Sequence, residues 1–455
     1  MPLPVIAIFD IGKTNKKVCL FDEEYNLLFE QAKVLPEIQD EDGFPCEDVT
    51  ALTNWTIQSY TALLKDEKYR IIAINVSAYG ASLVYLNALG EVMLPLYNYL
   101  KPYPPSLLQK FYNDYGDEKD ISKQTASPAL GHLNSGLQLY RLKYEKPDAF
   151  AKIKWALHLP QYIAYLLTNK IGTDITSIGC HTFTWDFARN AYHTWVEREG
   201  IASRFPPLLS SRGIAGHTKD GIPVGVGLHD SSAALIPYLS SFPDPFVLLS
   251  TGTWCISLNP FNHSPLTETE LENDCLCYLS HEGKSVKAAR IFAGNEHEQQ
   301  TKRLADHFNK PLDHFASLSV NEELIGRLKP TIPKHHPGQS KKTVSTSAFA
   351  EQSLNGFQSY EEAYHQLLID ILQQQVASTN QVLAGTSVSR IFVDGGFSKN
   401  PIFMKLLTGA YPTLEVYSSS MHQASALGAT MAIINKPRDK YKPYIYTKEL
   451  NRIKA

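Results

Sequence analysis

Apolar and polar positions follow two different periods along the chain, and the two kinds of stretch alternate. Short apolar runs predict strands at Val5–Phe9, Lys17–Phe21 and Arg70–Val76. Longer stretches predict helices at Thr53–Leu64, Ser135–Lys143 and Trp155–Leu167. This alternation of strands and helices favours an α/β fold.

One arrangement occurs twice. Strand Val5–Phe9, a glycine turn and strand Lys17–Phe21 return after Pro245 as strand Phe246–Leu249, the turn Ser250–Thr253 and strand Cys255–Leu258. Prolines and serines interrupt the pattern at Pro237–Pro245, where we place a domain boundary. We therefore expect two duplicated domains, residues 1–238 and 246–455, with a ligand held in a cleft between them.

Further elements are predicted on both sides of this boundary. A second hairpin is expected at Leu83–Leu86 and Glu91–Leu94, and strands at Pro223–Gly227, Arg390–Val393 and Glu415–Tyr417. Helices are expected at Ser231–Leu235, from Ser359 (in a capping box with Glu362) to near Gly385, and at Ala424–Ile434. The polar stretch His281–Gln300 is interpreted as a surface loop, although a cleft wall or a subunit contact in a homodimer would also suit it. The basic, tyrosine-rich tail after Lys436 is interpreted as docked and solvated.

Composition narrows the class of protein. A chain of 455 residues suits two domains. A formal net charge of −3 gives no sign of a nucleic-acid surface, and no apolar run is long enough to cross a bilayer, so neither nucleic acid nor membrane is expected as a partner. The N-terminus lacks the basic start of a signal peptide, and the six cysteines are scattered. Free thiols in the cytoplasm are the preferred interpretation, and no zinc site is expected at Cys275 and Cys277.

Three loops that follow strands contain glycine: Asp10–Thr14, Ser250–Thr253 and Asp394–Asn400. Glycine lets the backbone approach a phosphate closely, and amides and Thr hydroxyls then donate hydrogen bonds. Each loop alone is better explained by a tight turn, but three together indicate phosphate binding. Gly12-Lys13-Thr14 is not a Walker A P-loop, because Ala7 occupies the position of its first glycine and a strand follows the loop.

Asp230 lies between a predicted strand and a predicted helix of small residues, in Gly225-Val-Gly227-Leu-His229-Asp230. The stretch is not a dinucleotide fingerprint, because its last glycine is missing. Asp230 is either an N-cap or a catalytic carboxylate beside His229, and the local sequence leaves both open. Asp10 is similarly open: it caps a turn, or it holds Mg²⁺ through water.

In this order, the loops resemble those of the FGGY carbohydrate kinases of the actin-like ATPase superfamily, over nearly the whole length. Gly227-Leu-His229-Asp230 is similar to the family's Gly-x-His-Asp stretch, whose Asp is the general base. Asp10-Ile-Gly-Lys-Thr14 with Lys17 resembles the first phosphate loop, and Ser250–Thr253 resembles the second. Asp394-Gly395-Gly396 with Asn400 resembles the segment that holds the nucleotide.

The resemblance implies two duplicated actin-like (ribonuclease H-like) domains, ATP and Mg²⁺ as cofactors, and a small sugar as substrate. It assigns the catalytic role to Asp230, metal binding to Asp10 and sugar binding to Gly80, Ser82, His229 and Asp230. It assigns ATP binding to Gly12, Lys13, Thr14, Lys17, Thr251, Gly252, Thr253, Gly395, Gly396 and Asn400.

Ser135–Pro147 and Tyr79-Gly80 are most similar to L-rhamnulose and L-fuculose kinases. However, Ser82 stands where rhamnulokinases carry Asp, and Gln423 stands where Glu is usual. A xylulose or ribulose kinase is therefore an alternative specificity. Two rival functions are a non-sugar actin-like ATPase, which has no reason to carry Gly-x-His-Asp, and a kinase-derived sugar sensor without turnover. Sugar-dependent ATP consumption distinguishes the kinase from both.

Overall fold

The computed structural model describes residues 1–331, 348–419, 423–434 and 450–452. The contacts group these residues into two units. The first unit comprises Met1–Ser241, Cys277–Ser285 and the described part of Gln423–Lys442; the second comprises the rest.

The first unit is built on a seven-stranded sheet in the order β13-β14-β6-β1-β2-β3, with β15 also paired to β6. Its strands are β1 (Leu3–Ile11), β2 (Asn15–Phe21), β3 (Leu27–Val34), β6 (Tyr69–Ala78), β13 (Ile214–His217), β14 (Pro223–Gly225) and β15 (Leu228–His229). Short two-stranded sheets accompany it: β4 (Glu37–Gln39) with β5 (Pro45–Glu47), β7 (Leu83–Leu86) with β8 (Trp155–His158), β9 (Thr173–Asp174) with β12 (Leu208–Leu209), and β10 (Trp185–Asp186) with β11 (Ala191–Tyr192).

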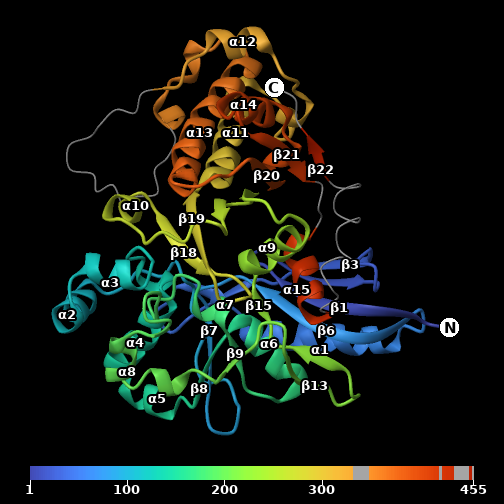
Figure 1. Cartoon of the computed structure of the whole chain (residues 1–455), viewed down its shortest axis with the longest axis vertical. Coiled ribbons are helices and arrows are strands. Elements are labelled where there is room, and N and C mark those ends of the chain that lie inside the picture. Colours follow the sequence, from blue (N-terminus) through green and yellow to red (C-terminus); the bar gives the residue numbers. More distant parts are fainter. Residues whose placement is uncertain (332–347, 420–422, 435–449, 453–455) are drawn as a thin grey trace. The chain divides into compact units, whose positions relative to one another are not determined.

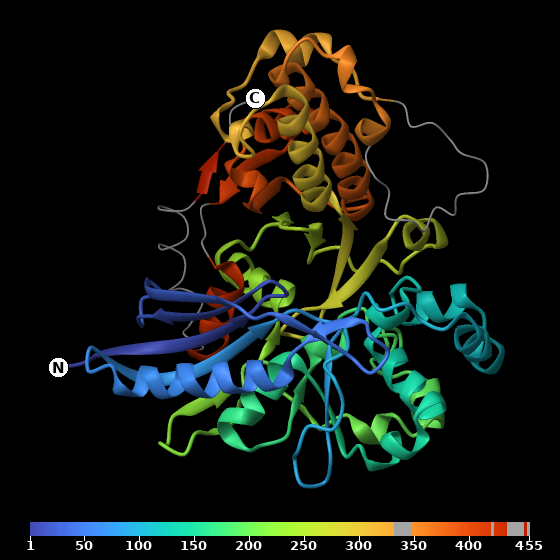
Figure 2. The same cartoon turned by 180° about the vertical axis from the view of Figure 1, so that it is seen from behind.

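The first unit also contains α-helices, some of which contact this sheet while others pack in a second apolar cluster. They are α1 (Val49–Lys65), α2 (Pro105–Tyr115), α3 (Glu118–Gln124), α4 (Ser135–Glu145), α5 (Pro147–Lys152), α6 (Leu159–Thr168), α7 (Ile175–Ile178), α8 (Thr194–Arg198), α9 (Asp230–Ser241) and α15 (Ala424–Ile434). Helix α1 runs alongside the first strands in both views (Figures 1 and 2).

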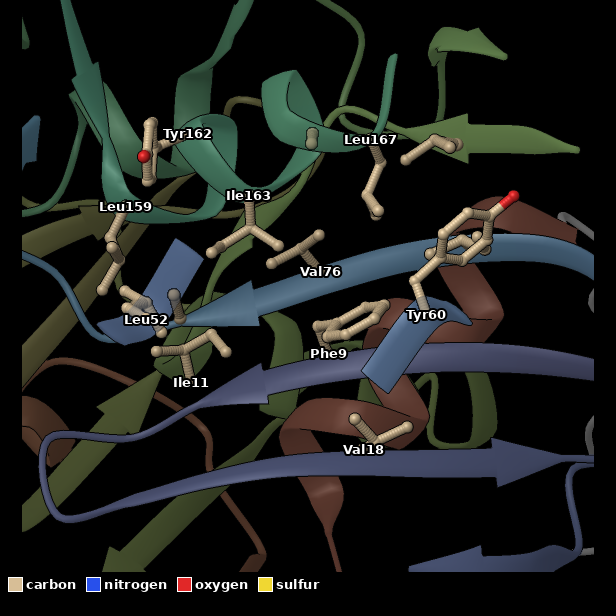
Figure 3. Close-up of a cluster of buried hydrophobic side chains, with 14 of the residues drawn as sticks. Phe9, Ile11, Val18, Leu52, Tyr60, Val76, Leu159, Tyr162, Ile163 and Leu167 are labelled. Atoms are coloured by element: carbon tan, nitrogen blue, oxygen red, sulfur yellow. The ribbon is translucent and has the colours of Figure 1, made fainter. Parts of the chain in front are cut away.

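Strand alternation decides which side chains of β1 enter the core. Phe9 and Ile11 join a buried cluster with residues of α1 and α6, among them Leu52 and Ile163 (Figure 3). Asp10, between them, therefore points to the other face of the sheet. Helix α15 packs against β1 and β6 there.

The second unit has its own seven-stranded sheet, in the order β18-β19-β17-β16-β20-β21-β22. Its strands are β16 (Phe246–Thr251), β17 (Cys255–Asn259), β18 (Cys275–Leu279), β19 (Ser285–Ile291), β20 (Arg390–Gly395), β21 (Glu415–Ser419) and β22 (Leu450–Arg452). Its helices are α10 (Glu268–Glu272), α11 (Ala293–Phe308), α12 (Glu322–Arg327), α13 (Tyr360–Leu383) and α14 (Pro401–Ala410), and α13 packs against both α11 and α14 (Figure 1).

The predicted duplication is present in the strand pairing. In the first unit β1 pairs antiparallel with β2 and parallel with β6. In the second unit β16 pairs antiparallel with β17 and parallel with β20. Each glycine turn therefore joins the same kind of hairpin, and each hairpin lies beside a parallel strand. The predicted α/β fold of two similar halves is confirmed.

Two predictions of local structure were wrong, and a third was confirmed only in part. The helix expected at Trp155–Leu167 begins at Leu159, because Trp155–His158 forms strand β8 and pairs with β7. The second hairpin is present in part: it turns at residues 87–90 as predicted, and Leu86 and Val92 form an antiparallel bridge, but no strand forms at residues 91–94. The stretch His281–Gln300 is not a loop, since it contains β19 and the first half of α11.

The two units do not divide the chain as simply as 1–238 and 246–455. The tip of the β18–β19 hairpin and helix α15 group with the first unit. Leu279 at that tip fills the space above Gly179, where an added Cβ would lie 2.5 Å from the Leu279 side chain. Gly428 of α15 lies so close to α9 that a Cβ would lie 1.9 Å from the Ala233 carbonyl oxygen. Small residues on α15 therefore let it dock on the first unit.

Most of the tail after Lys436 lies outside the described residues. Among the described helices, none combines the length and the hydropathy that a membrane crossing requires.

Candidate active site

Asp10 lies at the end of β1, opposite Ser77 of the parallel strand β6. The hydroxyl of Ser425, on α15, donates a hydrogen bond to Asp10 Oδ1 at 3.0 Å. Burial raises the pKa of Asp10 to about 6; the nearby negative charge of Asp230 raises it further, while Ser425 and the Lys17 ammonium oppose the rise. Both carboxylates thus lie in the first unit, and the charge of Asp230 acts on the ionisation of Asp10.

Asp230 is the first residue of α9, directly after β15, which pairs with β6 on the side away from β1. Its Oδ1 accepts hydrogen bonds from the backbone N–H of Ser231 at 2.6 Å and from the Ser231 hydroxyl at 3.2 Å. An N-cap carboxylate accepts instead from amides two or three residues further on. Burial raises the pKa of Asp230 to about 6, although Ser231 partly offsets this effect.

His229 is buried beside Asp230, with its Nε2 atom 3.2 Å from Asp230 Oδ1 and 3.0 Å from Cys180 Sγ. Burial lowers the pKa of His229 to about 4, so the ring is neutral at pH 7. The ring of Tyr278 meets it edge to face, with centroids 5.2 Å apart. A Cβ at Gly80 would lie 2.8 Å from Cys180 Sγ and 3.3 Å from His229 Nε2, so only glycine fits against this pair.

Ser82, the other predicted sugar contact, is only 2% exposed. It interacts with the hydroxyl of Tyr79, which donates to Glu47 at 2.6 Å. Gly80, His229 and Asp230 are thus brought together, whereas Ser82 is covered by its neighbours and its sugar contact stays a prediction.

In the first glycine loop, the lysine side chains are already paired. Lys13 Nζ lies 2.8 Å from Glu37 and 3.3 Å from Glu47. Lys17 Nζ donates to the side-chain oxygen of Gln423 at 2.8 Å. Gly12 forms the turn, and Thr14 next to it is exposed.

Sequence reasoning missed Lys16, which is 1% exposed. Its Nζ donates to the carbonyl oxygens of Gly12 at 3.0 Å and Lys13 at 2.9 Å, and pairs with Glu47 at 2.9 Å. These bonds fix the backbone of the turn. In the sequence, Lys16 is one of several polar residues near the start of a strand, so nothing indicated this role.

In the second unit, two glycine loops meet. The Thr251 hydroxyl donates to the Asp394 carbonyl and accepts from the N–H of Phe397 at 3.0 Å. Gly395 has φ +83°, and an added Cβ would lie 2.0 Å from the Thr251 carbonyl oxygen. The residues left exposed at this junction are Gly252, Thr253, Gly395 and Gly396.

Helix α11 begins beside this junction, another feature that the sequence did not reveal. A Cβ at Gly294 would lie 1.9 Å from the Gly252 carbonyl oxygen, and the Asn295 N–H donates to the Thr253 carbonyl at 3.2 Å. Phe292 precedes the helix without a side-chain cap. The partial positive charge of the helix N-terminus therefore lies next to exposed backbone.

The side chain of Asn400 forms hydrogen bonds within the second unit. Its Oδ1 accepts from the N–H groups of Ile402 and Phe403, both at 3.1 Å, and its Nδ2 donates to the Tyr364 hydroxyl at 2.7 Å. Asn400 is thus the N-cap of α14 and ties this helix to α13. Direct contact between Asn400 and a nucleotide stays a prediction.

Within the described residues, no three His, Cys, Asp or Glu side chains gather in a way that suits a metal ion. Cys275 and Cys277 are buried and are not in a disulfide. A pocket of about 510 Å³ in the first unit contains none of the predicted site residues. In the wall of this pocket, Arg212 donates a hydrogen bond to His281 Nε2 at 2.8 Å, so these two side chains bond to each other.

Two family models match the chain. The N-terminal domain of the FGGY family of carbohydrate kinases matches residues 5–236, and the C-terminal domain of carbohydrate kinase FGGY matches residues 243–442. The first match alone spans half of the chain. Both halves of the chain are therefore accounted for by one family.

Curated relatives match at modest identity. A rhamnulokinase from Mannheimia succiniciproducens is 25% identical over 263 residues, which cover 55% of this chain and 52% of the relative. A probable L-xylulose kinase from Haemophilus influenzae is 26% identical over 274 residues, which cover 54% of each chain. The matched region thus spans about half the length of each relative.

Solved structures show the same fold over the whole length. A carbohydrate kinase from Novosphingobium aromaticivorans aligns over 100% of this chain and 94% of its own, with a TM-score of 0.79 at 23% identity. A glycerol kinase from Plasmodium falciparum, solved with ADP, aligns over 96% of this chain and 91% of its own, with a TM-score of 0.75 at 17% identity. With both domains matched and the fold shared throughout, the chain belongs to the FGGY family of carbohydrate kinases.

Proposed function

We propose that the chain is an ATP-dependent carbohydrate kinase that transfers the γ-phosphate to a terminal hydroxyl of a small ketose such as L-rhamnulose or L-fuculose, with Asp230 as general base. The observation that carries the proposal is the pair of carboxylates beside β6. Each has a pKa raised to about 6, and the two are close enough to interact. Perturbed carboxylates at one place are typical of catalytic sites.

Asp230 is suited to accept a proton. About a third of its side chain remains accessible, at 35%, so a sugar hydroxyl can reach it. With a pKa of about 6 it is ionised at pH 7, yet it is a stronger base than an ordinary aspartate. Its bonds to Ser231 hold Oδ1, which leaves Oδ2 to accept the proton.

The sugar would contact Gly80, Ser82, His229 and Asp230. Gly80 lets the backbone come close to the Cys180–His229 pair, and neutral His229 orients hydroxyl groups without adding charge. Specificity among ketoses depends on a few such hydrogen bonds. The buried position of Ser82 and the match to a probable L-xylulose kinase favour xylulose as a second candidate substrate.

ATP would be held by Thr251, Gly252, Thr253, Gly395, Gly396 and Asn400 of the second unit and by Gly12, Lys13, Thr14 and Lys17 of the first. Exposed glycine backbone beside the N-terminus of α11 is suited to phosphate. Because the polar atoms of Thr251 and Asn400 already bond within the protein, we infer that these two residues act by shaping the loops.

Asp10 would hold Mg²⁺ through water. Mg²⁺ sites in kinases use one or two carboxylates together with substrate phosphates, so a place without three protein ligands still fits this ion. When bound, Mg²⁺ supplies neutralisation of the phosphate charge. The Ser425 hydroxyl and the Lys17 ammonium keep Asp10 oriented and favour its ionised form.

The remaining predictions concern cellular context. The six cysteines are buried and none is in a disulfide, which suits the reducing cytoplasm. A homodimer stays a prediction that light scattering would test.

The test is ADP release from Mg²⁺-ATP with a panel of L-rhamnulose, L-fuculose, L- and D-xylulose, L- and D-ribulose, D-fructose and glycerol. We expect one or two compounds to stimulate release strongly. ATP binding with no stimulation by any of the panel would contradict the assignment. Asp10→Ala should weaken the dependence of the rate on Mg²⁺, and an unchanged dependence would return Asp10 to a purely structural role.

A further inference from the structure

Ser232 lies one helical turn after His229, on α9, and is 1% exposed. Its Oγ is 3.3 Å from His229 Nδ1 and 3.0 Å from the carbonyl oxygen of Leu279, at the tip of the β18–β19 hairpin. The Ser232 hydroxyl therefore stands between the imidazole and a backbone carbonyl.

The direction of these bonds follows from chemistry. A carbonyl oxygen can only accept, so the single Ser232 hydroxyl proton goes to Leu279. The lone pairs of Oγ then accept a proton from His229, which places the proton of the neutral ring on Nδ1. Nε2 is consequently unprotonated.

The contact that Cys180 makes with the other ring nitrogen, Nε2, supports the same tautomer. Cys180 Sγ lies 3.0 Å from His229 Nε2, and a thiol is a weak donor that suits an unprotonated ring nitrogen. The opposite tautomer would point an N–H at this thiol and at Asp230 Oδ1. It would also place the lone pair of Nδ1 against the Ser232 oxygen, unless the hydroxyl turned from the Leu279 carbonyl to the ring.

We propose that Ser232, backed by the Leu279 carbonyl, is a positioning residue that keeps the proton of His229 on Nδ1 and presents an unprotonated Nε2 to Asp230. The inference rests on the proposed role of Asp230 as base. Nε2 is 3.2 Å from Asp230 Oδ1, so while Asp230 is ionised two sets of lone pairs face each other. Uptake of the sugar's proton at Oδ2 neutralises Asp230 and so weakens this repulsion, which favours proton transfer in the direction of catalysis.

The structure offers matched variants. Ser232→Ala removes the hydroxyl, and Ser232→Thr retains it. Ser241→Ala is the control, because Ser241 is also on α9, is 1% exposed and donates to a carbonyl, that of Pro237 at 2.7 Å. It separates the loss of any buried hydroxyl on α9 from the loss of this one.

The direct readout is ¹⁵N NMR of histidine-labelled protein, in which protonated and unprotonated imidazole nitrogens have well-separated shifts. The signals of His229 are assigned by their loss in His229→Asn. We expect a protonated Nδ1 in the wild type, Ser232→Thr and Ser241→Ala, and a move of the proton toward Nε2 in Ser232→Ala. In the kinase assay, kcat of Ser232→Ala should fall about 10-fold with KM within about 2-fold, as expected when a hydrogen bond that acts in the transition state is lost.

A proton on Nε2 in the wild type, or an unchanged tautomer in Ser232→Ala, would overturn the proposal. If Ser232→Ala does not fold, the wild-type and Ser232→Thr spectra still decide it. A wild type without kinase activity would sink the proposed function, while the tautomer would be measured all the same.

Discussion

The ionised form of Asp230 should lower the free energy of unfolding of the first unit. Burial raises its pKa from 3.8 to about 6, and such a change corresponds to about 3 kcal/mol. Because 35% of the side chain is exposed, water screens part of this penalty, and we expect about 1–2 kcal/mol. Asp230→Asn removes the charge and keeps the shape, so it should stabilise the protein while it abolishes catalysis.

The gain should depend on pH in a defined direction. The folded protein binds the Asp230 proton more tightly than the unfolded chain, so wild-type stability is lost as the pH rises from about 4 through about 6. The Asn variant has no such loss. The two proteins should therefore unfold alike at pH 4, and the variant should be more stable at pH 8. Loss of the Asp230 charge also relieves Asp10, which adds to the gain.

Parallel thermal unfolding at pH 4 and pH 8 is the assay. The expected Tm increase at pH 8 is about 2–4 °C. Asp148→Asn, at an exposed position of the same unit, removes an equal charge and serves as control. A variant no more stable than the wild type at pH 8, or an increase that persists at pH 4, would refute the reasoning.

Two further predictions concern the loops. Gly395→Ala should destabilise the second unit by more than about 2 kcal/mol, because φ is +83° and the new Cβ would lie 2.0 Å from the Thr251 carbonyl oxygen. Gly396→Ala, whose Cβ would be 3.8 Å from the same oxygen, should be nearly neutral, and equal denaturation midpoints for the two variants would contradict this account. Lys16→Met should cost about 2 kcal/mol in chemical denaturation, because Glu47 loses its 2.9 Å partner and keeps only Lys13, at 3.3 Å, as a cation. A combined Lys16→Met and Glu47→Leu variant should recover part of that loss, and a stable single variant would count against the network.

The fold was predictable where local signals agreed. The hairpins β1–β2 and β16–β17 combine apolar strands with glycine turns, and all of these signals lie within one short stretch of sequence. Strand β8 was missed because four residues before a helix carry no period of their own; its pairing with β7 depends on a partner about 70 positions earlier in the chain. The docking of α15 on the first unit was equally hidden, since small residues indicate close packing but not the partner.

For the candidate site too, residues with a local signal could be singled out, whereas those that depend on remote partners could not. Asp10 and Asp230 were singled out because each lies at or directly after the end of a strand and stands in a recognisable motif. Ser425, which bonds Asp10, and Ser232, which bonds His229, were missed because serines within helices are common and their partners are remote or backbone atoms. For Ser82, the sequence suggested a sugar contact, which stays a prediction, and only the structure reveals how deeply the residue is buried.

The most direct test of the central claim is ³¹P NMR of Mg²⁺-ATP incubated with the best ketose of the panel and either the wild type or Asp230→Asn. The account predicts that the γ-phosphate signal is replaced by one phosphate monoester with the wild type, and that the variant binds ATP but forms none. Release of inorganic phosphate without a monoester by the wild type, or monoester formation by the variant near the wild-type rate, would contradict it.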